Sequence, residues 1–235
     1  MIKIKQDISH GMGYVVLEKF IPIHLIDKIN SRLGEIRPVR ASNKNKKYAE
    51  NEEVKNLQDI CVWWSQSLLD WDEVKEINNL LHPVVIEHLA NGQLYSSDIV
   101  VIEPNTKWIN PHVDTPHRFQ KYNYDKRLLG IQGIVALSNL DENSGSTGLV
   151  PKSQNIDFNI NLCYKGLYEE FFKTNCVQPK MPIGSVLLYN CRVLHSSMPI
   201  KQNTSRPALL LNYLDSSIIE DVKSMDNIWS SNGNT

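Results

Sequence analysis

Apolar positions over the first forty residues indicate one strand followed by one helix. Gly13-Tyr-Val-Val-Leu-Glu18 is rich in β-branched and aromatic residues, which favours a strand. Pro22 then stands where a helix can begin, and Pro38 ends it. Between the two prolines, apolar residues recur at the spacing of one helix face; they are Leu25, Ile26, Ile29, Leu33 and Ile36.

Residues 40–56 pass from basic to acidic with few apolar groups, so we expect an exposed loop or a short helix there. Residues 57–90 are more apolar and predict two or three helices, with Trp63 and Trp64 among their apolar residues. Residues 1–92 are therefore expected to form a largely helical N-terminal part that packs on the rest of the chain.

From about residue 93 the pattern changes to short β-rich runs, which are 98–102, 128–140, 184–189 and 208–214. Turn sequences such as Glu103-Pro-Asn separate them. Many short strands favour a sandwich or jelly roll over a parallel sheet, so residues 93–214 are expected to form a β core. An aromatic-rich insert at about 155–180 is expected to be partly helical, and the polar tail at 215–235 to be loosely held.

The overall composition narrows the possible classes of protein. With 235 residues and neither an internal repeat nor a domain-sized linker, we expect a single domain, mainly β with flanking helices. A formal net charge of −1 provides no long-range field to attract nucleic acid or anionic lipid, which disfavours a nucleic-acid partner. The oligomeric state is left open.

Cysteine usage and hydropathy bear on the compartment. Four scattered cysteines include no C-x-x-C pair, so neither a disulfide framework nor a cysteine zinc site is indicated. The chain shows no signal-peptide pattern and no apolar run of about 18 residues, so no membrane span is expected. These features together predict a cytoplasmic location.

Two histidines, His112 and His195, occupy positions from which they could bind a metal ion. His112 and Asp114 are two positions apart, and in an extended segment such residues face the same side. His195 follows the β-rich run 184–189, which can run beside the first segment in a sheet. Two histidines and one carboxylate on one side of a metal are the ligands of non-haem iron(II) oxygenases. Taken alone, the His-x-Asp motif is more often a turn histidine beside a hydrogen-bonded aspartate than a metal site.

Arg206 strengthens the metal interpretation. It lies eleven residues after His195 and opens an apolar β-rich run, so a strand–loop–strand connection returns it towards the histidine. A guanidinium group binds a carboxylate through two parallel hydrogen bonds, which suits the far carboxylate of a dicarboxylic acid. A lone arginine at a strand end is more often a solvated charge, but the apolar run behind Arg206 makes that explanation less suitable here.

These segments together resemble the phytanoyl-CoA dioxygenase-like family of iron(II)/2-oxoglutarate-dependent oxygenases. The resemblance follows the chain in order through six segments, which are 13–18, 112–114, 141–154, 182–189, 195–197 and 206–208. It implies a double-stranded β-helix core of the jelly-roll or cupin-like type. It also implies iron(II), 2-oxoglutarate as cosubstrate, and O2. The implied partner is a small-molecule substrate, which the resemblance does not identify.

The resemblance also implies roles for particular residues. His112, Asp114 and His195 would be the iron ligands, and Arg206 would pair with the distal carboxylate of 2-oxoglutarate. A carboxylate in the position of Asp114 leaves no room for a halide ligand, which favours a hydroxylase over a halogenase. The implied activity is therefore hydroxylation of the substrate with release of succinate and CO2.

Further positions are carried over with less support or depart from the family. Ser197 would assist Arg206, and Thr115 would lend a hydrogen bond to the cosubstrate, although such hydroxyl groups more often bond to local backbone. The chain has Pro151-Lys-Ser-Gln154 where the family usually has Pro-Gly-Ser-His, which puts the loop shape in question. His117 is a rival ligand, which we expect to lie behind the ligands or to face the substrate.

Two other interpretations stay open. One is a non-catalytic cupin-type module that binds a metal or ligand, in which His112 and His195 are structural or hold zinc. The other is an iron enzyme that uses no 2-oxoglutarate. Arg206 has no evident role in either.

Overall fold

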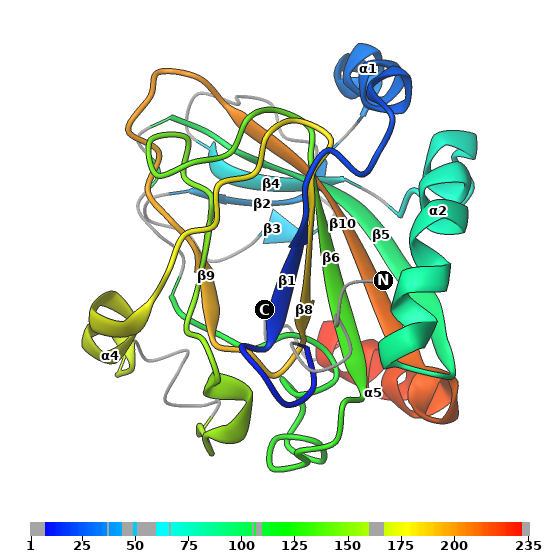
Figure 1. The fold of residues 1–235 in the computed structure, drawn as a ribbon, viewed down its shortest axis with the longest axis vertical. Helices are drawn as coiled ribbons and strands as arrows, with labels where there is room; N and C mark the ends of the chain where they lie inside the picture. Colours follow the sequence, from blue (N-terminus) through cyan, green and yellow to red (C-terminus); the bar gives the residue numbers. More distant parts are fainter. Residues whose placement is uncertain are drawn as a thin grey trace.

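A computed structural model describes residues 8–36, 38–43, 49–50, 60–65, 67–104, 106, 110–159 and 167–231. Its centre is an antiparallel sheet in the order β1-β8-β6-β10-β5-β4-β2-β3 (Figure 1). The strands are β1 (Tyr14–Leu17), β2 (Pro38–Asn43), β3 (Ala49–Glu50), β4 (Ile60–Ser65), β5 (Gly92–Ile102), β6 (Gly130–Ala136), β8 (Val186–Asn190) and β10 (Arg206–Asp215). The helices are α1 (Ile23–Ser31), α2 (Asp72–His88), α4 (Glu169–Asn175) and α5 (Ile219–Ser231).

Alternation along the central strands gives the sheet two buried faces. In β8, Val186 and Leu188 belong to the cluster that includes residues of α1 and α2. Leu187 and Tyr189 belong to a second cluster on the opposite face. Successive side chains of a strand point in opposite directions. Because both sets are apolar in β8, both faces of the sheet are apolar there. We call the helix side the outer face and the Tyr189 side the inner face.

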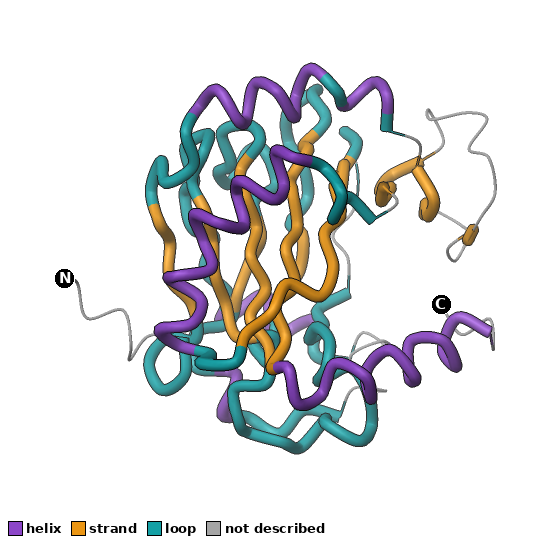
Figure 2. The backbone as a smooth tube through the Cα atoms, turned by 90° about the vertical axis from the view of Figure 1, so that its right-hand side faces the viewer, coloured by secondary structure: helices purple, strands orange, loops and turns teal. Residues whose placement is uncertain are grey.

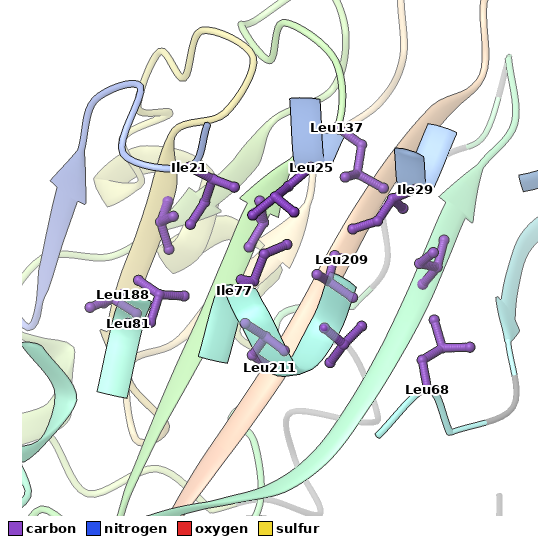
Figure 3. Packing of buried hydrophobic residues seen from close by; sticks show 14 of the residues in the cluster. Ile21, Leu25, Ile29, Leu68, Ile77, Leu81, Leu137, Leu188, Leu209 and Leu211 are labelled. Atoms are coloured by element: carbon purple, nitrogen blue, oxygen red, sulfur yellow. The ribbon is translucent and has the colours of Figure 1, made fainter. Parts of the chain in front are cut away.

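Helices α1 and α2 cover the outer face (Figures 1 and 2). The helix predicted after Pro22 is confirmed, with Leu25, Ile26 and Ile29 fully buried. In Figure 3, Leu25 and Ile29 lie in the same cluster as Leu209 of β10 and Leu188 of β8. Burial of each such side chain contributes about 1.5–3 kcal/mol before the entropy of ordering is subtracted.

A second, smaller layer faces the inner side of the sheet. Strand β7 (Thr147–Leu149) pairs with β9 (His195–Ser197). Isolated antiparallel bridges extend this pair on both edges, from His112 to His195 and from Leu149 to Val177. Two antiparallel layers with an apolar interior between them form a jelly-roll arrangement. The predicted mainly β fold with flanking helices is confirmed.

The predicted helical character of residues 1–92 is only partly correct. Trp63 and Trp64 lie in strand β4, which pairs with β5, and α2 is the one α-helix in the described part of 57–90. Residues 40–43 belong to β2 and extend the same sheet, whereas 44–48 and 51–56 lie outside the described residues. The run Ile60-Cys-Val-Trp-Trp has high β propensity, and it forms a strand that is hydrogen-bonded to the long strand β5.

The prediction of a loosely held tail after residue 214 is wrong for residues 216–231, which are helical. Residues 216–218 form one 3₁₀ turn, and α5 follows. Ile218 and Val222 are buried against Phe119 and Leu214. Their spacing of four residues is that of one helix face, although Ser, Asn and Asp dominate the composition. The partly helical insert is confirmed by α4.

No helix among the described residues combines the length and the apolar character that crossing a membrane requires.

The outer-face core generates a stability prediction. Replacing Leu209, which is fully buried, with alanine leaves a cavity in the outer-face cluster and should lower the free energy of unfolding by about 2–5 kcal/mol. Leu80→Ala on α2, where the side chain is exposed, should change it by about 0.5 kcal/mol or less. Urea denaturation measures both. Equal losses in the two variants would contradict this packing.

Candidate metal centre

A backbone pairing brings two sequence-distant histidines side by side. The amide of His112 donates to the carbonyl of His195 at 2.9 Å, and the amide of His195 donates to the carbonyl of His112 at 3.0 Å. The two imidazole rings lie on the same side of this bridge, with centroids 4.3 Å apart. The predicted proximity of the two segments is therefore present.

Asp114 completes a group of three. Its amide donates to the carbonyl of Cys191 at 2.8 Å, which ties it to the turn after β8. Its Oδ1 lies 4.0 Å from Nε2 of His112, and its Oδ2 lies 3.4 Å from Nε2 of His195. One potential ligand atom from each of the three residues lies within 4.8 Å of the other two. Among the described residues, His112, Asp114 and His195 are the one group of three or more histidine, cysteine or acidic side chains close enough together to hold a metal ion.

Both imidazoles are arranged to coordinate through Nε2. Nδ1 of His112 lies 2.8 Å from the carbonyl oxygen of Asn110, and Nδ1 of His195 lies 3.0 Å from that of Val193. A carbonyl only accepts, so each Nδ1 carries the hydrogen and each neutral ring keeps its lone pair on Nε2. Burial, with a smaller contribution from His195, lowers the pKa of His112 to about 4. His112 is therefore uncharged at neutral pH, as a metal ligand must be.

Tyr189 orients the carboxylate. Its hydroxyl donates to Oδ2 of Asp114 at 2.8 Å. Burial and the neighbouring Asp114 raise the pKa of the Tyr189 phenol, so it remains a donor. Sequence reasoning did not single out Tyr189, although the period-two alternation of β8 places it on the inner face. The arrangement leaves Oδ1 without the tyrosine bond.

Arg206 lies on the inner side with unused hydrogen-bonding capacity. It is 3% exposed, and its Nη2 donates to Oγ1 of Thr147 at 3.2 Å. Its Nε has no hydrogen-bond partner among the described residues. Burial lowers the pKa of Arg206 to about 10, which still leaves it positively charged at neutral pH. A buried cation with an unused donor is costly, so this guanidinium fits an incoming carboxylate.

Thr147 supplies a hydroxyl next to Arg206. Ser197 lies directly opposite Thr147 in the β7–β9 pairing and stays a prediction. Thr147 is a residue that sequence reasoning missed. Its place in the run Ser144-Gly-Ser-Thr-Gly148, which carries part of the family resemblance, was the available signal. Thr115 is buried directly after Asp114 and precedes a cis peptide bond to Pro116.

His117 does not join the metal-binding group. It is fully buried, and its Nδ1 lies 3.0 Å from the carbonyl oxygen of Tyr122. Burial is the main cause that lowers its pKa to about 4. The expected position behind the ligands fits this burial, and His112, Asp114 and His195 form the group without it.

The departure at 151–154 preserves a usable loop. Lys152, in the position where the family usually has glycine, adopts a left-handed conformation with φ of 65°. The conformation that glycine takes readily is thus kept at a cost of about 1–2 kcal/mol. Ser153 accepts the amide hydrogen of Leu194 through Oγ at 2.8 Å, and Gln154 donates to the carbonyl of Gly11 at 3.1 Å.

Three cations in the segment after Asp114 are paired with carboxylates. Arg118 forms an ion pair with Asp226, Lys121 with Asp221 at 2.6 Å, and Lys126 with Asp157 at 3.2 Å. Because each is already paired, these three cations are less available to attract an anionic substrate group.

Comparisons with known proteins identify a family and a shared fold. The family model described as Phytanoyl-CoA dioxygenase (PhyH) matches residues 9–208. No curated protein sequence matches the chain.

Solved structures share the fold at low identity. HygX from Streptomyces hygroscopicus, with nickel, 2-oxoglutarate and hygromycin B bound, has a TM-score of 0.69 at 13% identity, over 92% of this chain and 88% of its own. EctD from S. alaskensis, with 2-oxoglutarate and 5-hydroxyectoine, has 0.67 at 15% identity, over 92% and 77%. The epimerase SnoN from nogalamycin biosynthesis has 0.66 at 13% identity, over 87% and 77%. These likenesses confirm the predicted jelly-roll, cupin-like core.

The burial of His117 generates a prediction for the metal-free protein. An ordinary histidine has a pKa of about 6.5. Between pH 6.5 and pH 4, His117 is therefore protonated in the unfolded state but largely neutral in the folded state, which favours unfolding. Its stability contribution is complete above pH 6.5 and is lost as pH falls towards 4, by up to about 1.4 kcal/mol per pH unit.

His117→Gln should therefore show a shallower fall in the free energy of unfolding between pH 6.5 and pH 4.5, measured with a chelator present. His24→Gln, whose side chain is 61% exposed, should keep the wild-type slope. A slope in His117→Gln identical to wild type would contradict the burial of a neutral imidazole.

Proposed function

The chain belongs to the phytanoyl-CoA dioxygenase family, and we propose that it is an iron(II)- and 2-oxoglutarate-dependent hydroxylase of a small molecule. His112, Asp114 and His195 are proposed to hold iron(II). Arg206 is proposed to anchor the distal carboxylate of 2-oxoglutarate, with Thr147 beside it.

The observation that carries this proposal is the pairing of the three-residue group with a buried arginine on the same inner face. The Tyr189 hydroxyl, on the inner face, donates to Asp114, and Arg206 lies two residues before Ala208 of the same inner-face cluster. A non-catalytic module, or an iron enzyme without a dicarboxylate cosubstrate, has no use for an unsatisfied buried guanidinium. The geometry therefore supports the oxygenase over both alternatives.

The donor set suits iron(II). Two neutral imidazoles and one carboxylate on one side of the ion leave its remaining positions open for other ligands. When bound, iron(II) with 2-oxoglutarate and O2 supplies the oxidation of a C–H bond, coupled to formation of succinate and CO2. The protein's contribution is to bind, orient and exclude competing reactions.

Each residue has a definite task in that contribution. Backbone carbonyls hold both imidazoles with Nε2 directed at the Asp114 carboxylate. The phenol of Tyr189 keeps its proton and fixes one carboxylate oxygen. The planar guanidinium of Arg206 recognises a carboxylate through two points and thereby sets the direction of the cosubstrate.

The apolar inner face limits access of water. Ile134, Leu187 and Ala208 are buried in the cluster between the two layers. In such surroundings, the attraction between Arg206 and a carboxylate is stronger than in water. The cosubstrate is accordingly expected to lie against this cluster.

Hydroxylation of a small molecule is the finer part of the proposal. Asp114 occupies the position that a halide would need, which favours hydroxyl transfer. The structural neighbours include an epimerase and a protein crystallised with 5-hydroxyectoine, so the shared fold serves several outcomes. Placement of the substrate, rather than the fold, is expected to decide among them.

Removal of the carboxylate tests the proposal directly. Asp114→Ala should abolish 2-oxoglutarate turnover, because it removes one of three metal ligands. Glu170→Gln, an exposed carboxylate on α4, is the control and should keep wild-type turnover. Succinate release, measured with iron(II), ascorbate and a panel of small molecules, is the readout. Retained turnover in Asp114→Ala would refute the ligand assignment.

A further inference from the structure

We propose that Arg192 is a positioning residue of the metal centre: its buried guanidinium holds the turn between β8 and β9 in the shape that orients both Asp114 and His195. The inference rests on the proposed metal site. Arg192 touches neither the ligands' donor atoms nor any reacting group, so its effect is transmitted through the backbone.

The position of Arg192 in the chain is the first step. It lies between Cys191, whose carbonyl accepts the amide hydrogen of Asp114 at 2.8 Å, and Val193, whose carbonyl lies 3.0 Å from Nδ1 of His195. The two carbonyls that flank Arg192 thus orient two of the three proposed ligands. A rotation of either peptide group would turn a ligand away from the ion.

The hydrogen bonds of the guanidinium are the second step. Arg192 is 2% exposed, and each of its three nitrogens has a partner. Nε donates to the carbonyl of Gln154 at 2.7 Å and Nη1 to the carbonyl of Asn123 at 2.7 Å. Nη2 donates to the carbonyl of Ile156 at 3.0 Å and to Oδ1 of Asp157 at 2.7 Å. The turn is thereby tied to two separate loops.

Those two loops are themselves connected to the site. Residue 123 lies in the segment that follows Asp114, and residues 154–157 follow β7, which carries Thr147. Ser153, at the start of the second loop, accepts the amide hydrogen of Leu194, directly before His195. One side chain therefore joins the segment after Asp114, the segment before His195 and the segment after β7.

The chemistry of arginine suits this task. Its planar fork directs donors towards several acceptors at fixed angles, whereas the ammonium group of lysine is a compact point charge. Asp157 balances the buried charge, and Arg192 is the main cause that lowers the pKa of the Asp157 carboxyl. Lys126 binds the other oxygen of Asp157 at 3.2 Å, on the half-exposed side.

Cobalt(II) binding tests the inference without relying on turnover. Residues that orient metal ligands typically change metal affinity by about 10–100-fold when they are mutated. Arg192→Lys should therefore weaken cobalt(II) binding by about that factor and alter the visible absorption of the bound ion. Asp157→Asn should weaken binding in the same direction by a smaller factor. Titration calorimetry and absorption spectra provide the two readouts.

Two control variants separate positioning from stability. Arg32→Gln removes an ion pair with Glu73 next to the outer-face helices, and should lower the melting temperature while leaving cobalt(II) affinity at the wild-type value. Lys126→Met removes the other partner of Asp157 and should also bind cobalt(II) as wild type does.

The possible contrary results are distinct. Wild-type affinity and spectrum in Arg192→Lys would overturn the inference. If Arg192→Lys does not fold, equal affinities in Asp157→Asn and Lys126→Met would overturn it. By contrast, absence of cobalt(II) binding in the wild type, or undiminished binding in Asp114→Ala, would refute the metal site and with it the proposed function.

Discussion

Two backbone hydrogen bonds between His112 and His195 are the constraint on which the centre depends. They join the segment that carries Asp114 to strand β9, and they bring the two imidazole rings to a centroid separation of 4.3 Å. The same bridge extends the β7–β9 pair into a second layer opposite the main sheet. The two-layer fold is therefore a condition for the proposed metal site, which lies where the smaller layer faces the larger one.

The main sheet contributes the side chain that orients Asp114 and the apolar core that stabilises the strands. Alternation along β8 sends Leu188 to the helix-covered outer face and Tyr189 to the inner face, where its hydroxyl reaches Asp114. Apolar burial on the outer face stabilises these strands. On the inner face, Tyr189 is hydrogen-bonded to Asp114, whereas Nε of Arg206 has no partner among the described residues. Stability and chemistry thus come from opposite faces of the same strands.

Sequence patterns predicted the features that depend on local residues. The spacing of Leu25, Ile26 and Ile29 indicated α1, and the β-branched runs indicated β5, β6, β8 and β10. His112 and Asp114 were recognisable because same-face spacing is a local property. The β-rich run before His195 and the eleven-residue spacing to Arg206 suggested that these two residues lie nearby, and the resemblance to a known family implied their roles.

The features that were missed depend on contacts between distant segments. Strand β4 is stabilised by its pairing with β5. The C-terminal helix α5 is stabilised because Val222, together with Ile218 just before it, packs against Phe119 and Leu214. The bond between Arg206 and Thr147 follows from the meeting of β10 with β7, which no local pattern reports. The same holds for the tautomers of the histidines, since backbone carbonyls set them.

The most direct test of the account is an anaerobic titration of the iron(II)-loaded protein with 2-oxoglutarate, followed by visible absorption. A weak charge-transfer band should appear in the wild type and should need much higher 2-oxoglutarate concentrations in Arg206→Met, because the carboxylate anchor is gone. Absence of the band in the wild type, or an unchanged titration in Arg206→Met, would contradict the assignment of this inner face as an iron(II)/2-oxoglutarate site.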